Sequence, residues 1–180
     1  VNSSESTEYF QLLNQDMYLA PDYFEKVVAM MDSNPEAGAG QGILLRWRFE
    51  EMTNDELRMK NEIVGLTDVV DTLGLQVRRN RRVVDWRTGE HNAPQPPRNL
   101  RGGEGGVIEV FGVSGALPIY RRKVIEEVSF EDKMFDEDFF MYKEDVDLAF
   151  RLRSAGWKAF IEPSARAWHD RTAAGPREMS

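Results

Sequence analysis

The first fifty residues alternate between a strand pattern, a helix pattern and a second strand pattern, and this alternation restricts the fold most. "EYFQLLN" reads as a buried strand ending at a turn residue. "APDYFEKVVAMMDSNPE" reads as a helix with its apolar residues at helical spacing, namely Phe24, Val27, Val28 and Met31. "AGAGQGILLRWRF" then reads as an interior strand, so the order strand, helix, strand predicts an α/β fold.

The length, net charge and cysteine content of the chain limit its number of domains, its partners and its cellular compartment. The length of 180 residues fits a single domain, residues 1–180. The net charge of −8 repels nucleic acid, so we expect no nucleic-acid partner. The absence of cysteine excludes disulfides and fits a reducing compartment. Because neither a long apolar run nor a signal-peptide pattern is visible, we expect a cytoplasmic location.

The middle of the chain reads as charged and irregular. Residues 50–64 read as a solvated helix, and residues 69–86 as two short strands around the basic turn "RRNRR". That turn is either a solvated hairpin tip or a contact for a diphosphate. Residues 87–106, rich in glycine, proline and asparagine, predict a mobile loop that orders over a bound ligand.

The last part of the chain reads as further strands and helices. "VIEVFGV" predicts a strand, "ALPIYRRKVIEEV" an amphipathic segment, and "KAFIEP" with "ARAWHD" a final pair of strands.

Asn14 and Asp16 in "LLNQDMYL" follow an apolar strand. Side chains two residues apart on a strand point to the same face, so these two could hold a hard cation such as Mg²⁺ or Mn²⁺. A local turn before the helix at Pro21 explains the same residues.

The stretch "KEDVDLAFRLRSAGW" predicts a helix with three acids in its first turn. Its apolar stripe comprises Leu148, Ala149, Leu152 and Ala155. Asp145 lies on that stripe, where a carboxylate needs a partner or a wet cleft, and there it could act as a general base. Asp147 suits an exposed ion pair with Arg151, and Glu144 suits the positive end of the helix dipole.

Two weaker signals remain. Gly112 and Gly115 flank Ser114 in "GVSG", which reads as a plain turn unless the sheet edge beside it is a ligand site. His169 in "ARAWHD" is either a structural imidazole or a ligand for a transition metal near Asp16.

Together these stretches resemble family 2 glycosyltransferases of the GT-A fold, close to the bacterial rhamnosyltransferase-like members. The matching pieces are "LLNQDMYLAPDYF", "DTLGLQVRRNRRVVDWRTGE", "EVFGVSGALPIYRRKVIEEV" and "FDEDFFMYKEDVDLAFRLRSAGWKAFIEPSARAWHD". The resemblance implies a mixed sheet flanked by helices, in an incomplete GT-A-like domain. The segment that binds the nucleobase in that family has no counterpart before Val1, so we expect the isolated chain to lack a complete donor pocket.

The resemblance also implies roles for individual residues. Asp16 would bind a divalent cation, Mg²⁺ or Mn²⁺, with His169 completing its ligands. Asp145 would be the general base and Glu144 would help to hold the acceptor. The remaining candidates, Asn14, Gly112, Ser114 and Gly115, would lie beside the donor and acceptor.

The implied reaction transfers a sugar, with inversion, from a nucleotide-diphosphate sugar to a saccharide or lipid-linked acceptor. Such an acceptor would bring the chain to the inner face of the membrane, and exposed sheet edges would allow pairing with a second copy. A non-catalytic module that binds a glycan or a protein is the alternative. A calcium-binding module on "DEDFFMYKEDVD" fits poorly, because Phe139, Phe140 and Met141 occupy the middle of the would-be loop.

Overall fold

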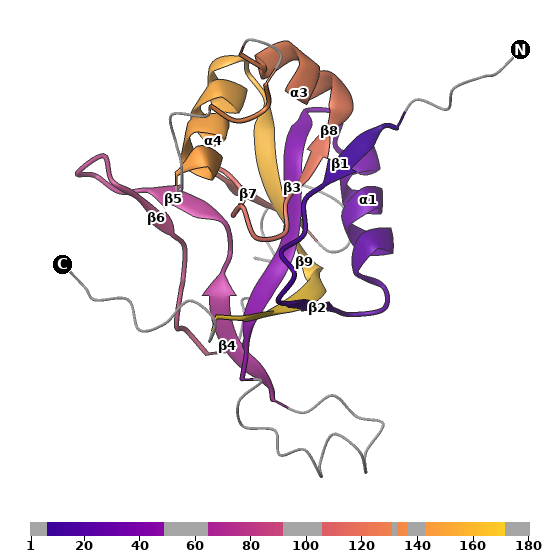
Figure 1. Cartoon of the computed structure of the whole chain (residues 1–180), viewed down its shortest axis with the longest axis vertical. Coiled ribbons are helices and arrows are strands. Elements are labelled where there is room, and N and C mark those ends of the chain that lie inside the picture. The colour runs from indigo at the N-terminus through magenta and orange to yellow at the C-terminus, as the bar shows by residue number, and fades with distance from the viewer. Residues whose placement is uncertain (1–6, 49–64, 92–105, 131–132, 137–142, 172–180) are drawn as a thin grey trace, which may run out of the picture.

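A computed structural model describes residues 7–48, 65–91, 106–130, 133–136 and 143–171 (Figure 1). Three predictions fall outside these ranges: the solvated helix at 50–64, residues 92–105 of the predicted mobile loop, and the apolar residues 139–141 that argue against a calcium loop. None of the helices in the described part of the chain is long and apolar enough to cross a membrane.

The described residues form a mixed sheet of seven strands in the order β1-β8-β3-β9-β2, with β4 beside β3 and β7 beside β9 (Figure 1). The strands are β1 (Tyr9–Gln11), β2 (Met17–Leu19), β3 (Ala37–Trp47), β4 (Leu66–Thr72), β7 (Ile108–Val110), β8 (Ile119–Arg121) and β9 (Lys158–Asp170). The long central strands β3 and β9 are parallel, and every other described pair is antiparallel. The predicted α/β class with a mixed sheet is therefore confirmed.

Each of the two central strands pairs along its outer edge with two shorter strands, one beside each half. The first half of β3 pairs with β8 and its second half with β4. In the same way, the first half of β9 pairs with β7 and its second half with β2. The sheet therefore curls, and the short strands β2 and β4 bring their side chains to the far ends of β3 and β9.

Helices cover both faces of the sheet. Helix α1 (Tyr23–Ser33) packs on one core, and helices α3 (Arg122–Val128) and α4 (Glu144–Ser154) pack on the other (Figure 1). Alternation along β3 supplies both cores, because Leu44 faces α1 whereas Ile43 and Leu45 face α3 and α4. The domain is thus a sheet between two layers of helix, compatible with an incomplete GT-A-like domain.

The predicted helix after Pro21 is confirmed, but its buried face is rotated. Tyr23, Val27, Met30 and Met31 are buried, whereas Phe24 is 46% exposed. The Tyr23 hydroxyl accepts a hydrogen bond of 2.9 Å from the backbone N–H of Gly42 on β3. An alanine at position 42 would place its Cβ 2.5 Å from the Tyr23 ring, so the glycine makes room for this contact.

Two strand predictions need correction. The strand predicted from "EYFQLLN" has only three residues and is not buried, since β1 lies at the end of the sheet order and Phe10 is 38% exposed. The predicted final pair of strands is one strand, β9, whose two halves both pair with β3. The register jumps between the pairs Gly42–Glu162 and Ile43–Arg166, so three residues of β9 bulge out at Pro163.

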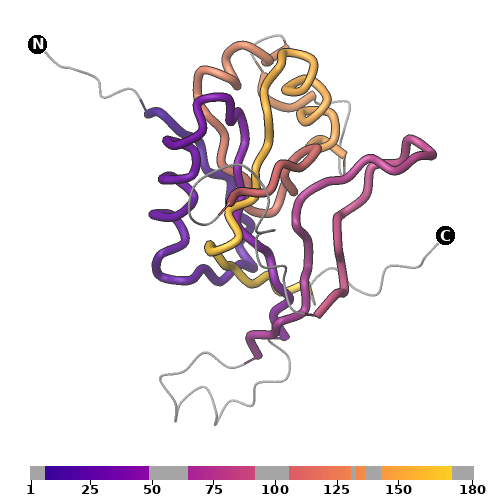
Figure 2. The backbone as a smooth tube through the Cα atoms, turned by 180° about the vertical axis from the view of Figure 1, so that it is seen from behind, coloured from indigo at the N-terminus to yellow at the C-terminus, as the bar shows by residue number. Residues whose placement is uncertain are grey.

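The predicted hairpin around the basic turn is confirmed. Strands β5 (Leu75–Val77) and β6 (Val83–Asp85) form a separate two-stranded sheet that projects from the body of the molecule (Figure 2). The base of the hairpin is tied to the body, because the N–H of Leu75 donates a 2.8 Å hydrogen bond to the carbonyl of Gly112. The arginines of the turn at 78–82 are exposed at the tip.

Candidate functional site

Helix α4 is held by its predicted apolar stripe and by one arginine. Leu148, Ala149 and Leu152 are buried as predicted, but Ala155 is exposed because it follows the last helical residue. Arg151 pairs with Asp147 at 2.8 Å and also donates to the backbone carbonyls of residues 128 and 134. Both side chains of this pair are largely buried, so the prediction of an exposed pair was wrong.

Asp145 is half-buried and turns toward the 114–115 turn. Its Oδ2 accepts a 3.1 Å hydrogen bond from the backbone N–H of Gly115. Burial raises the pKa of the Asp145 carboxyl; the Gly115 N–H opposes this, and the nearby charge of Glu144 adds to it. A carboxylate with a raised pKa is a stronger base than an ordinary aspartate, which suits the abstraction of a proton.

Glu144 lies beside Asp145 and has spare hydrogen-bonding capacity. Its Oε2 is buried and has no hydrogen-bond partner in the described structure. A Cβ at Gly115 would lie 3.6 Å from both Glu144 Oε1 and Asp145 Cβ. The two carboxylates therefore border the same glycine, and an unpartnered oxygen there can accept a hydrogen bond from a hydroxyl.

The residues of the "GVSG" turn differ in what they contact. Gly112 packs against Ala149 of α4, where an added Cβ would lie only 2.5 Å from the Ala149 Cβ. Ser114 is buried, and its N–H donates a 2.8 Å hydrogen bond to Gln41 Oε1. Of these three residues, Gly115 borders the acidic pair. Contact of Gly112, Ser114 and Gly115 with a sugar stays a prediction.

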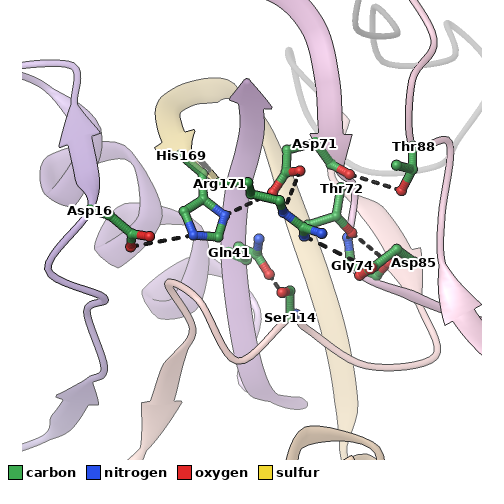
Figure 3. A network of polar contacts seen from close by, with 10 residues as sticks. All are labelled: Asp16, Gln41, Asp71, Thr72, Gly74, Asp85, Thr88, Ser114, His169 and Arg171. Atoms are coloured by element: carbon green, nitrogen blue, oxygen red, sulfur yellow. Dashed lines mark hydrogen bonds and ion pairs between the residues drawn. The ribbon is translucent and has the colours of Figure 1, made fainter. Parts of the chain in front are cut away.

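A second cluster gathers around His169. The structure brings the two predicted metal ligands together, with His169 Nε2 3.4 Å from Asp16 Oδ1 (Figure 3). Pairing of β2 with β9 accounts for this, because Met17 lies opposite His169 and the N–H of Asp170 donates to the Asp16 carbonyl at 2.9 Å.

The sequence predicted that Asn14 and Asp16 share a strand face, and the structure shows that they do not. Strand β1 ends at Gln11, and the chain turns before β2 begins. Asn14 is exposed, and its backbone N–H donates a 3.0 Å hydrogen bond to the carbonyl of Ala116. The alternation rule fails here because it holds only where the backbone is extended.

Sequence reasoning missed Asp71, Asp85 and Arg171, which complete this cluster. Asp71 Oδ2 lies 2.9 Å from His169 Nδ1, and Asp71 Oδ1 lies 2.7 Å from Arg171 Nε. Arg171 in turn lies 3.9 Å from Asp85. The available signal was an acid inside the apolar run "VVDTL", since a buried carboxylate requires a partner.

Asp85 joins the two clusters. It approaches Arg171 on one side, and its charge contributes to raising the pKa of Asp145 on the other. The hydrogen bond from Asn14 to Ala116 makes a further link, because it holds the chain before Asp16 next to the 114–115 turn. Asp85 and the 114–116 turn thus both link the acidic pair of α4 to the His169 cluster.

The His169 cluster fits a divalent cation in two respects. Asp16 Oδ1 is a buried oxygen without a hydrogen-bond partner, and it lies beside an imidazole nitrogen. Carboxylate and imidazole are ligands that Mn²⁺ accepts. Among the described residues no group of three or more acids and histidines is placed to hold a metal ion. A cation here would draw its other ligands from water and from a bound phosphate.

The environment of Asp145 predicts a pH-dependent stability. Because its pKa is raised on folding, the ionised carboxylate destabilises the folded state. This cost is absent when the pH is below the ordinary pKa of aspartate. It sets in as the pH rises through that ordinary pKa, and it is complete when the pH exceeds the raised pKa of the folded state. Asp145→Asn should therefore melt at a higher temperature than the wild type near pH 7, and the difference should shrink toward about pH 4. A lower Tm for the variant at every pH would contradict this.

Comparison with known proteins adds a partial match. A stretch of 57 residues is 44% identical to N-acetylglucosaminyl-diphospho-decaprenol L-rhamnosyltransferase from Mycobacterium tuberculosis, in each of two strains. The stretch covers 32% of this chain and only 17% of the relative. No family model matches the chain. The similarity supports a relationship to glycosyltransferases.

Proposed function

We propose that the chain carries the catalytic and metal-binding part of an inverting glycosyltransferase of family 2. The observation that carries the proposal is the half-buried Asp145, with its raised pKa, next to the Asp16–His169 pair. Sugar transfer from a diphosphate requires a base for the acceptor and a cation for the leaving group. The acid pair Glu144–Asp145 can supply the base, and the pair Asp16–His169 can hold the cation. The partial similarity to a rhamnosyltransferase points the same way.

The donor in this proposal is a nucleotide-diphosphate sugar, and the acceptor is a saccharide that is free or linked to a lipid. The relative's name describes an acceptor sugar joined through a diphosphate to a polyprenol, which favours a lipid-linked acceptor. Such an acceptor would place the protein at the inner face of the membrane.

Each residue then has a distinct task. Asp145 accepts the proton of the acceptor hydroxyl as its oxygen attacks the anomeric carbon of the donor. Glu144 accepts a hydrogen bond from a second acceptor hydroxyl through its unpartnered oxygen. Asp16 and His169 would hold Mg²⁺ or Mn²⁺, and such an ion would supply stabilisation of the negative charge on the leaving diphosphate. A single displacement by the acceptor inverts the anomeric centre.

The proposal predicts a cation site that depends on Asp16. Mn²⁺ titrated with a nucleoside diphosphate should bind the wild-type protein expressed from its complete gene. Loss of an outer-shell partner weakens metal binding by about 10–100-fold. Asp16→Ala removes a direct ligand, so it should weaken Mn²⁺ binding by more than that. Calorimetry, or the signal of free Mn²⁺ in electron paramagnetic resonance, measures the effect.

The chain offers a matched control for this experiment. Asp68 and His91 form another Asp–His contact, at 3.3 Å, but both side chains are more than 60% exposed. Asp68→Ala should leave Mn²⁺ binding unchanged. Wild-type protein that binds neither Mn²⁺ nor the nucleotide would overturn the enzyme proposal and favour a non-catalytic binding module.

A further inference from the structure

Asp71 is a buried charge for which the proposed reaction has no direct use. Its side chain is 0% exposed on β4. Burial of a carboxylate is unfavourable unless partners compensate for its lost hydration. Here Oδ2 lies 2.9 Å from His169 Nδ1, whereas Oδ1 makes a charge contact of 2.7 Å with Arg171 Nε, without a hydrogen bond between these two atoms. The Asp71 backbone is also fixed, since its carbonyl accepts a 2.8 Å hydrogen bond from the Thr88 hydroxyl.

The two partners determine what Asp71 can do. A guanidinium only donates and always carries a charge, so Arg171 Nε, at 2.7 Å, faces Asp71 Oδ1 as an accepting oxygen. An ionised carboxylate only accepts hydrogen bonds. The contact of 2.9 Å between Asp71 Oδ2 and His169 Nδ1 therefore requires the proton of a neutral imidazole to be on Nδ1.

The other imidazole nitrogen is then left with a lone pair. His169 Nε2 points to Asp16 Oδ1, which has no hydrogen-bond partner (Figure 3). A carboxylate that orients a histidine in this way is the usual support of a metal-binding imidazole. The chain of contacts from Arg171 through Asp71 to His169 thus ends at the place where the cation would bind.

We propose that Asp71 is a positioning residue, which holds His169 in the tautomer whose Nε2 can ligate a divalent cation together with Asp16. This inference rests on the proposed function for the presence of the cation. It assigns no contact between Asp71 and the substrates.

The tautomer can be observed directly, because the chain has only two histidines. His91 is exposed, so His91→Gln leaves His169 as the only source of imidazole signals. In protein labelled with ¹⁵N-histidine, at a pH where the ring is neutral, the NMR spectrum should show the proton on Nδ1. A neutral His169 with its proton on Nε2 would overturn the proposal without any change at Asp71.

Asp71→Asn should invert the tautomer. The asparagine amide has one accepting and one donating end, and Arg171 can only donate to it. The carbonyl oxygen is therefore drawn to Arg171 and the NH₂ group faces His169, whose Nδ1 must now accept and whose Nε2 must carry the proton. Mn²⁺ affinity should fall about 10–100-fold, as expected for loss of an outer-shell partner.

A double variant separates this effect from simple damage to the fold. In Asp71→Asn with Arg171→Met, the amide is free to turn its carbonyl toward His169, so the Nδ1 proton and most of the Mn²⁺ affinity should return. Circular dichroism of each variant checks the fold. Wild-type protein without Mn²⁺ binding would overturn the proposed function. Mn²⁺ binding that Asp71→Asn leaves unchanged would overturn the positioning role alone.

Discussion

Asp145→Asn is expected to lower kcat by about 10²–10⁴-fold, the usual contribution of a general base. The amide cannot take a proton from the acceptor hydroxyl, although it can still accept the hydrogen bond from Gly115. Binding of Mn²⁺ and nucleotide should be unchanged, because Asp145 is not one of the two residues proposed to hold the cation. Steady-state kinetics and Mn²⁺ titration on the protein from its complete gene measure the two effects.

Asp147→Asn is the matched control. It removes a carboxylate from the same helical turn, but one that faces Arg151 at 2.8 Å. Because Arg151 then loses its charged partner in a largely buried place, the variant should lose about 1–3 kcal/mol of stability, while its kcat should stay close to that of the wild type. An Asp145→Asn variant that is as active as Asp147→Asn would overturn the assignment of the base.

Gly112→Ala is expected to destabilise the fold by about 1–3 kcal/mol, the usual cost of overpacking. The new Cβ would lie 2.5 Å from the Cβ of Ala149, so helix α4 must move away from the backbone around Gly112. Activity should fall as well, because Asp145 is on the same helix. Chemical denaturation measures the loss of stability.

The clash can be relieved from the other side. Ala149→Gly alone should cost about 1 kcal/mol through its lower helix propensity, but it removes the opposing Cβ. The double variant should therefore be more stable than the sum of the two single changes predicts. Gly115→Ala is the control for stability, since its Cβ would have 3.6 Å to the nearest atom. Strictly additive costs would show that the contact with Ala149 does not limit the packing.

Local patterns predicted the parts of the fold that local interactions determine. Helix α1, strand β3 and the β5–β6 hairpin all follow from spacing and turn residues. The apolar stripe of α4 placed Asp145 correctly for the same reason. Periodicity could not show that β1 lies at an edge, because exposure depends on which strands are neighbours.

The candidate site was predictable only in part. Asp16 and His169 were singled out as single residues, but Asp71 was not, since its partner His169 lies 98 positions away in the sequence. The stretches "KAFIEP", which ends at Pro163, and "ARAWHD" were predicted as two separate strands. The structure instead accommodates Pro163 in a bulge, because both halves of β9 find the same partner strand.

The bulge in β9 also fixes the orientation of everything that follows it. Three additional residues between Glu162 and Arg166 are an odd number, so the strand resumes with its faces exchanged. Phe160 and Ala167 therefore lie in the same core although one position is even and the other odd. Loss of a single residue from the bulge would exchange the faces again and turn His169 away from Asp71, whereas loss of two would preserve them. The parity of a three-residue insertion thus determines whether the end of β9 presents His169 to Asp71.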